Sequence, residues 1–242
     1  MDVYDFELIF HKLREDDERD LDSISLVSKR FLSVSNRVKL SLNVNDETLP
    51  LFPKLLQRFQ HIETIVIDTD IHKDIDGVFH QISRTGVMNL QAIKFSWFST
   101  KPLRDGFKAL ALNKNIKNNL KVLDCSRLIS IQDNDLVLIA DCFPRLEELR
   151  ISADMNKDDD KVAACITDDG VDALASKLKE FEAIEFAGDN CFITDKSLIS
   201  LSTNCVKLRK IGLFTYNSSH HYVTVDGIDF VIRHSPNLTS LC

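Results

Sequence analysis

Apolar residues recur along this chain in triplets, with two residues between the first and second apolar positions and one between the second and third. Alternation of this kind is typical of a short strand with one buried face. The first positions of successive triplets lie 26 to 35 residues apart. The full triplets are Ile62/Ile65/Ile67, Leu90/Ile93/Phe95, Leu120/Leu123/Cys125, Leu146/Leu149/Ile151, Phe181/Ile184/Phe186 and Leu208/Ile211/Leu213.

Between the triplets the apolar spacing changes to that of short amphipathic helices, as in ITDDGVDALASKL from Ile166 and ITDKSLISLSTNC from Ile193. One strand and one helix in about thirty residues cannot bury their own apolar faces, so such units must stack. The pattern therefore predicts an α/β fold, a right-handed solenoid with parallel strands on its concave side and short helices on its convex side. An ordinary α/β domain with short strands is the alternative. Helices are expected near 53–59, 74–83, 103–112, 133–142, 168–178, 195–204 and 225–233.

Threonine and aspartate recur where these helices begin. Thr167 and Thr194 stand at N-cap positions, where a side-chain oxygen accepts a hydrogen bond from a free backbone N–H group. Asp133, Asp168 and Asp195 fall in or near the first turn, where the helix dipole favours negative charge. A structural role is expected for these acids, and a metal-binding or catalytic role is the alternative.

The bulk composition narrows the classes of partner and compartment. The chain has 242 residues and a formal net charge of −7, which argues against nucleic acid or an anionic membrane as the main partner. No apolar run approaches the roughly 18 residues of a spanning helix, and the first residues lack the pattern of a signal peptide. Six cysteines without a C-x-x-C motif are expected to be small buried apolar residues of a reduced cytoplasmic or nuclear protein, with a disulfide framework as the alternative.

No catalytic or phosphate-binding motif occurs, so no enzyme activity, metal or cofactor is expected. The run Lys157–Lys161 is acidic at its centre but lacks the glycine and the distal glutamate of a calcium loop. It is interpreted as a solvated insertion that lengthens one repeat.

Residues 1–37 carry two further helical patterns, separated by a charged turn. The second contains LVSKRFL at positions 26–32. Together they resemble an F-box, and the repeats behind them resemble the cysteine-containing leucine-rich repeats of F-box proteins, most like the plant members. In that family the F-box binds the Skp-type adaptor of a cullin-based ubiquitin ligase. The resemblance implies adaptor contacts at matching apolar positions, which are Phe6, Ile9, Phe10, Leu13, Leu26, Val27 and Phe31.

The family usually opens with Leu-Pro, where this chain has Met1 and Asp2. The alternative for residues 1–37 is therefore a helical cap on the end of the solenoid. The expected organisation is an F-box-like module at 1–37 and a solenoid at 38–242, with about seven repeats and an incomplete last one. The implied function is that of a non-catalytic substrate receptor of an SCF-type ubiquitin ligase, which binds an adaptor, through it a cullin, and a target protein. A binding scaffold that does not engage the ligase is the alternative.

Residues beside the inward-pointing apolar positions are expected to line the concave face. One predicted row is Ser41, Val66, Lys94, Asp124, Arg150, Glu185 and Gly212, and the next is Asn43, Asp68, Ser96, Ser126, Ser152, Ala187 and Phe214. The alternating charges suit a protein segment better than a phosphate. Candidate contacts with a target are Lys94, Trp97, Phe98, Asp124, Arg150, Glu185, Phe214 and Tyr216, although core packing is the alternative for Trp97.

The last residues, Ser235–Cys242, read as the opening of another strand, with Leu238 and Leu241 in the triplet spacing. Solenoids usually end in a repeat with a polar outer face. The sequence is therefore expected to be a shortened form or a piece of a longer protein. Phe230 and Val231 are expected to be partly uncovered.

Overall fold

The computed structural model describes residues 8–13, 18–68, 75–84, 89–96, 103–128, 131–153, 165–214 and 222–242. Four of the candidate contact residues, Phe6, Trp97, Phe98 and Tyr216, lie outside these ranges, as does the acidic run Lys157–Lys161.

Parallel strands form one continuous sheet through the described part of the chain, in the order β1-β2-β3-β4-β5-β7-β9-β10. Each strand pairs with the strand of the next repeat, as stacked strand–helix units require. The strands are β1 (Ser41–Asn45), β2 (Thr64–Asp68), β3 (Ala92–Phe95), β4 (Val122–Cys125), β5 (Glu148–Ser152), β7 (Ala183–Ala187), β9 (Lys210–Phe214) and β10 (Ser240–Leu241).

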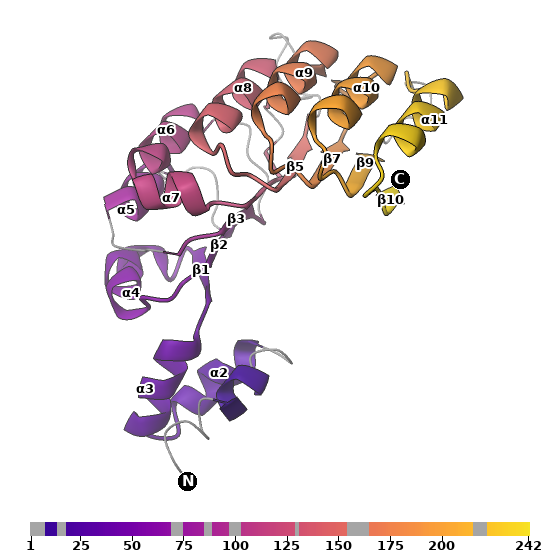
Figure 1. Ribbon diagram of the computed structural model, residues 1–242. Coiled ribbons are helices and arrows are strands. Elements are labelled where there is room, and N and C mark those ends of the chain that lie inside the picture. The colour runs from indigo at the N-terminus through magenta and orange to yellow at the C-terminus, as the bar shows by residue number, and fades with distance from the viewer. Residues whose placement is uncertain are drawn as a thin grey trace.

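Helices form a second layer outside this sheet, and the two layers bend together into an arc with the strands on the inner, concave side (Figure 1). Seven of these helices are those expected from the sequence, within two residues at each end. They are α4 (Phe52–Arg58), α5 (Ile75–Arg84), α6 (Arg104–Leu112), α8 (Asp133–Cys142), α9 (Asp168–Lys177), α10 (Asp195–Asn204) and α11 (Val225–His234).

The triplets form the core, as predicted. From Ile62 to Ile211 their apolar side chains are at most 5% exposed, and they belong to one continuous hydrophobic cluster with the inner faces of the helices. The α/β solenoid with concave strands and convex helices is therefore correct. The free thiols of Cys125, Cys142, Cys191 and Cys205 are buried in this cluster, which confirms the prediction that they act as small apolar residues. The prediction was wrong for Cys165, which is partly exposed, and for Cys242, which is exposed.

In the first repeat, the strand register differs by two residues from the one predicted. Leu42 and Val44 are its buried strand residues, and Asn43 rather than Ser41 pairs with Val66. The predicted concave rows therefore begin with Asn43 and Asn45. The position of the first apolar residue is held by Lys39, whose ammonium group lies 5.8 Å from the centre of the Phe59 ring. Because a lysine stands at this position instead of an apolar residue, the apolar pattern alone did not reveal the true register.

Four short elements were not among those expected from the sequence. They are a 3₁₀ helix η1 (Leu49–Leu51), a helix α7 (Lys114–Asn119) and a two-stranded ribbon of β6 (Ile166–Thr167) and β8 (Cys191–Phe192). The Asn113 side chain caps α7 by accepting hydrogen bonds from the backbone N–H groups of Asn115 and Ile116. The ribbon lies where two repeats enter their helices, so it ties neighbouring repeats together next to the main sheet.

The prediction of exposure in the last helix was correct for Phe230 and wrong for Val231. Phe230 is partly exposed, but Val231 is fully buried because that face of α11 packs against α10. Leu238 and Leu241 are partly buried against the main core, and β10 pairs in parallel with β9.

The N-terminal helices have a small core of their own. Residues 8–13 are helical, followed by α2 (Glu18–Ser25) and α3 (Lys29–Val38). Phe10, Leu21, Val34 and Val38 form a hydrophobic cluster separate from that of the repeats, with Ile24 and Phe31 packed against it. The clusters divide between Val38 and Leu42. The helices are tied to the first repeat by the Arg58 guanidinium, which donates two hydrogen bonds to Asn36 Oδ1 at 3.0 and 2.8 Å.

Candidate functional site

The concave face carries a row of charged side chains at its centre. Strand register places Lys94, Asp124, Arg150 and Glu185 opposite one another on β3, β4, β5 and β7. Lys94 is exposed, and the other three are partly exposed. The sequence therefore identified the members and the order of this row correctly.

Arg150 is the centre of an ion-pair network. Its guanidinium lies 2.7 Å from a carboxylate oxygen of Glu148, 3.5 Å from one of Glu185 and 3.6 Å from one of Asp124. Burial pushes the pKa of Arg150 down, but the carboxylates of Glu148, Glu185 and Asp124 outweigh it and leave this pKa raised. The Lys210 ammonium binds the other oxygen of Glu185. The network thus holds side chains of four adjacent strands in place.

Glu148 and Lys210 were not among the predicted contacts. They belong to a third row, one position before the second apolar residue of each triplet, where Val122, Glu148, Ala183 and Lys210 lie opposite one another. The triplet spacing could have identified this row. Two residues lie between the first and second apolar positions of each triplet, and the one directly before the second apolar position belongs to the row.

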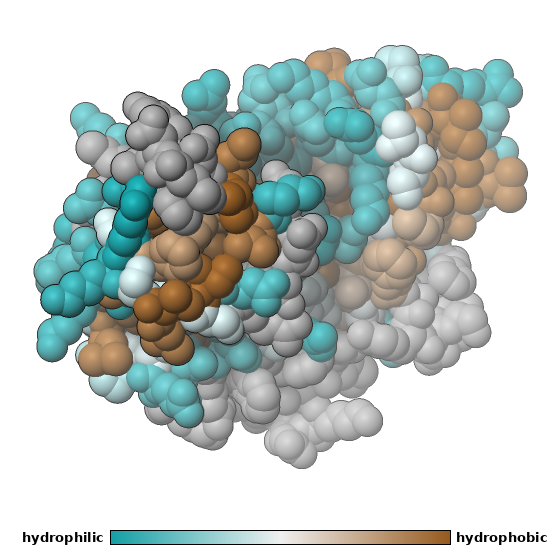
Figure 2. Space-filling view, turned by 90° about the horizontal axis from the view of Figure 1, so that it is seen from below, coloured by the Kyte–Doolittle hydropathy of each residue, from teal (hydrophilic) through white to brown (hydrophobic). Residues whose placement is uncertain are grey.

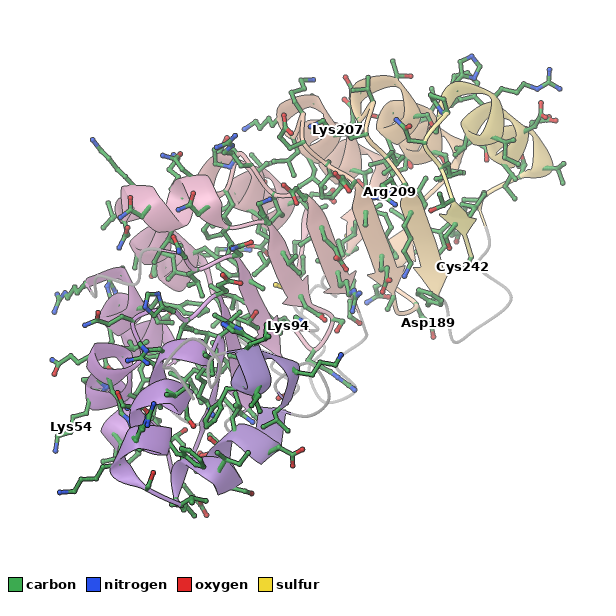
Figure 3. All side chains as sticks on the ribbon, turned by 60° about the horizontal axis from the view of Figure 1, so that its bottom comes forward. Lys54, Lys94, Asp189, Lys207, Arg209 and Cys242 are labelled. Carbon is green, nitrogen blue, oxygen red and sulfur yellow. The ribbon has the colours of Figure 1, made fainter. Side chains whose placement is uncertain are left out.

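Two hollows lie beside this third row of residues. The larger, of about 450 Å³, is lined by Glu63, Lys94, Lys121, Asp124, Glu147, Glu148 and Arg150 among others. The smaller, of about 260 Å³, lies beside it towards β9 and includes Glu182, Arg209 and Lys210. Lys94 and Arg209 mark the two ends of this stretch in Figure 3. Most of the charges are already paired, as in Lys121–Glu147 at 2.9 Å and Arg209–Glu182 at 3.7 Å. Basic side chains do not cluster, so the surface does not resemble a phosphate site.

An aromatic side chain stands at the end of β9. Phe214 is 46% exposed, and its ring lies over Gly212, where an added Cβ would come within 2.7 Å of the ring. The same Cβ would lie 3.1 Å from Glu185 Cγ. Glycine therefore interrupts the charged row because Phe214 occupies the space. An exposed, well-positioned aromatic ring is a frequent anchor of protein interfaces.

The N-terminal helices expose a second, apolar surface. Leu26 is 86% exposed, Val27 67%, Leu8 74% and Ile9 44%. Figure 2 shows brown, hydrophobic atoms gathered over this part of the molecule. The remaining described candidates for adaptor contact are less accessible. Phe10 is buried in the module's own core, Phe31 packs edge-on against it with ring centres 5.4 Å apart, and Leu13 is partly buried.

The part of the chain that the structure describes contains neither a candidate metal site nor a candidate membrane-spanning helix. No group of three or more His, Cys, Asp or Glu side chains there could hold a metal ion. Among the same residues, no helix combines the length and the apolarity needed to cross a bilayer.

Comparison with known proteins identifies the fold. No protein-family model matches the sequence, and no curated protein matches it. Among solved structures, a chain from the crystal structure of the Rad7 and Elc1 complex in yeast matches with a TM-score of 0.63. The two are 14% identical, and the match covers 98% of this chain and 67% of that chain. At this identity the likeness establishes a shared fold, that of a leucine-rich-repeat solenoid.

Proposed function

We propose that this chain is the substrate-recognition subunit of an SCF-type ubiquitin ligase. Residues 1–37 form the adaptor-binding module, and the repeats of 38–242 present the concave face to a target protein. The chain performs no bond chemistry in this role. It raises the effective concentration of a target's lysines near the conjugating enzyme.

The exposed apolar surface of the N-terminal helices is the observation that carries the proposal. Leu26 and Val27 lie in the turn between α2 and α3, and they extend into solvent although the adjoining module has a core of its own. A small helical module that served only to close the solenoid would not need large apolar residues pointing away from it. The fold neighbour is a chain from the complex of Rad7 with Elc1, which supports the proposal that this chain also binds a partner protein.

The proposed adaptor contacts are the apolar residues of the module that are accessible to a partner. Ile9, Leu26 and Val27, together with Leu8, are exposed, while Phe10 lies in the module's own core and Phe31 packs against that core. Phe6 remains a proposed contact from the sequence resemblance. On the concave side, Lys94, Asp124, Arg150, Glu185 and Phe214 are the proposed target contacts, with Trp97, Phe98 and Tyr216 proposed from the sequence alone.

The test is retention of a purified Skp-type adaptor by the full chain. The double variant Leu26→Asp/Val27→Asp should lose the adaptor, because binding would bury charges in an apolar interface. Leu112→Asp is the matched control, since Leu112 is 82% exposed on α6, far from the module in the chain. Retention by the control and loss by the double variant, with equal melting temperatures, supports the proposal. Failure of the unmodified chain to retain any adaptor would instead favour the scaffold function.

A further inference from the structure

The larger hollow on the concave face lies within the sheet, and its floor consists of short side chains. Its lining residues belong to β2, β3, β4 and β5 or directly precede them, and the sheet continues on either side with β1 and β7. Thr64, Ala92 and Val122 lie opposite one another there, in the third row. Because these side chains are short, the space above them stays open.

Longer side chains form a wall on each side of this floor. Residues that directly precede the strands form the first wall, and residues two positions after the third row form the second. The charged members are Glu63, Lys121 and Glu147 in the first wall, and Lys94, Asp124 and Arg150 in the second. The hollow is therefore a channel that runs across the strands between two lines of charge.

Most charges of the channel neutralise one another, but two at its β2–β3 end do not. Lys121 lies 2.9 Å from Glu147, and Arg150 belongs to the ion-pair network described above. Within the described ranges, Glu63 and Lys94 make no ion pair. Lys94 is exposed and Glu63 is partly exposed, so both can meet a partner. One negative and one positive charge thus face the channel from opposite walls, on neighbouring repeats.

An extended polypeptide segment matches the placement of these two charges. Neighbouring strands lie about 4.8 Å apart, while successive residues of an extended segment lie about 3.3 Å apart and point to opposite sides. In a segment that follows the channel, two adjacent residues would therefore face opposite walls, one towards Glu63 and the other towards Lys94. Adjacent residues of opposite charge would complement both walls.

We propose that the channel binds an extended segment of the target protein with adjacent acidic and basic residues, the acidic one at Lys94 and the basic one at Glu63. This inference rests on the proposed function and specifies the chemistry of its target. The acidic group is a carboxylate rather than a phosphate, because Asp124 is next in the same wall and would repel a doubly charged anion. Uncharged residues follow the charged pair, since the walls beyond it are already paired.

The experiment is selection of peptides from a random display library on the immobilised full chain, followed by affinity measurements with a selected synthetic peptide. Peptides with adjacent acidic and basic residues should be enriched. Lys94→Glu should raise the dissociation constant of such a peptide at least about tenfold. Lys54→Glu is the matched control, because Lys54 is exposed on α4 in the outer, helical layer, far from Lys94 (Figure 3).

A charge-reversed peptide tests the direct pairing. A peptide in which lysine replaces the acidic residue should bind the Lys94→Glu variant more tightly than it binds the unmodified chain. Lack of enrichment, or a selected peptide that Lys94→Glu and Glu63→Lys do not weaken, would overturn the inference. So would a Lys94→Glu variant that gains no preference for the lysine peptide. Adaptor retention is measured separately, so a chain that retains the adaptor but fails these tests would refute the channel assignment alone.

Discussion

The carboxylate of Asp168, in the first turn of α9, accepts a hydrogen bond from the Thr194 hydroxyl of the next repeat at 2.7 Å. Its other oxygen accepts from the backbone N–H groups of Thr194 and Ser197 at 3.0 and 3.2 Å, and from the Ser197 hydroxyl. The same link joins Asp133 to Thr167 and Asp195 to Thr224. Each threonine also caps its own helix. The aspartates thus connect one repeat to the next, as well as complementing their own helix dipoles.

Removal of one link should destabilise the fold. Asp168→Ala removes an acceptor from four donor groups of Thr194 and Ser197, of which the Ser197 N–H keeps its 3.1 Å bond to the Thr194 carbonyl. We therefore expect the free energy of unfolding to fall by about 1–3 kcal/mol. Chemical denaturation measures this change. Asp169→Ala is the matched control because Asp169 is exposed in the same turn and contributes mainly through the helix dipole, roughly 0.3–1 kcal/mol. Equal losses in the two variants would show that the link between repeats is energetically unimportant.

The same carboxylate should contribute to acid sensitivity. Partial burial pushes the pKa of Asp168 up, but the hydrogen bonds from Ser197 and Thr194 outweigh burial and leave the pKa lowered. The resulting stabilisation is complete above the unfolded pKa of about 3.9 and is lost as pH falls through the lower, folded value. Asp168→Asn should therefore flatten the decline of the unfolding free energy below about pH 4. An unchanged pH profile in this variant, with Asp169→Asn as reference, would contradict the assignment.

Close packing of these links requires a small residue three positions after the threonine. A Cβ at Gly227 would lie 2.1 Å from Asp195 Oδ1 and 2.5 Å from its Cγ. Gly227→Ala should therefore lower the melting temperature, although alanine is ordinarily favoured over glycine in a helix by about 1 kcal/mol. In an Asp195→Ala background the same substitution should be much less harmful. A Gly227→Ala variant more stable than the unmodified chain would show that the carboxylate can move aside.

The strand register of the solenoid can be tested at a fully buried leucine. Leu123 is fully buried in β4, so Leu123→Ala should cost about 2–5 kcal/mol of unfolding free energy, as cavity-forming truncations do. Lys121→Ala is the control, because Lys121 precedes the same strand and is exposed. Thermal melting distinguishes them, and a Leu123→Ala variant that melts with the unmodified chain would refute the register.

Cysteine reactivity should follow burial. Desolvation raises the pKa of Cys205 to about 11, and desolvation with nearby Asp124 and Asp135 raises that of the fully buried Cys125. Both thiols should resist alkylation near neutral pH, because the thiolate is the reactive form, whereas the exposed Cys242 should be modified readily. Peptide mapping after brief iodoacetamide treatment measures this. Equal labelling of Cys205 and Cys242 in folded protein would contradict the burial.

The repeat architecture could be predicted from the order of residues because it rests on local periodicity. A strand needs alternation and a short helix needs apolar residues three or four apart, and both requirements are present within single repeats such as Phe181–Asn204. Stacking follows, since neither element can bury its face alone. The row from Lys94 to Glu185 was predictable for the same reason, because side chains alternate along each strand.

Relations between repeats were decided by the tertiary structure. The sequence placed Asp168 near a helix N-terminus but could not show that its acceptor oxygens face Thr194, which lies 26 residues away. The outcome for Phe10 and Leu26 has the same basis, since both are apolar residues in helical patterns and only packing buries one and exposes the other. Apolar spacing specifies which face of an element is buried, whereas the identity of the group that covers it depends on contacts between segments distant in the chain.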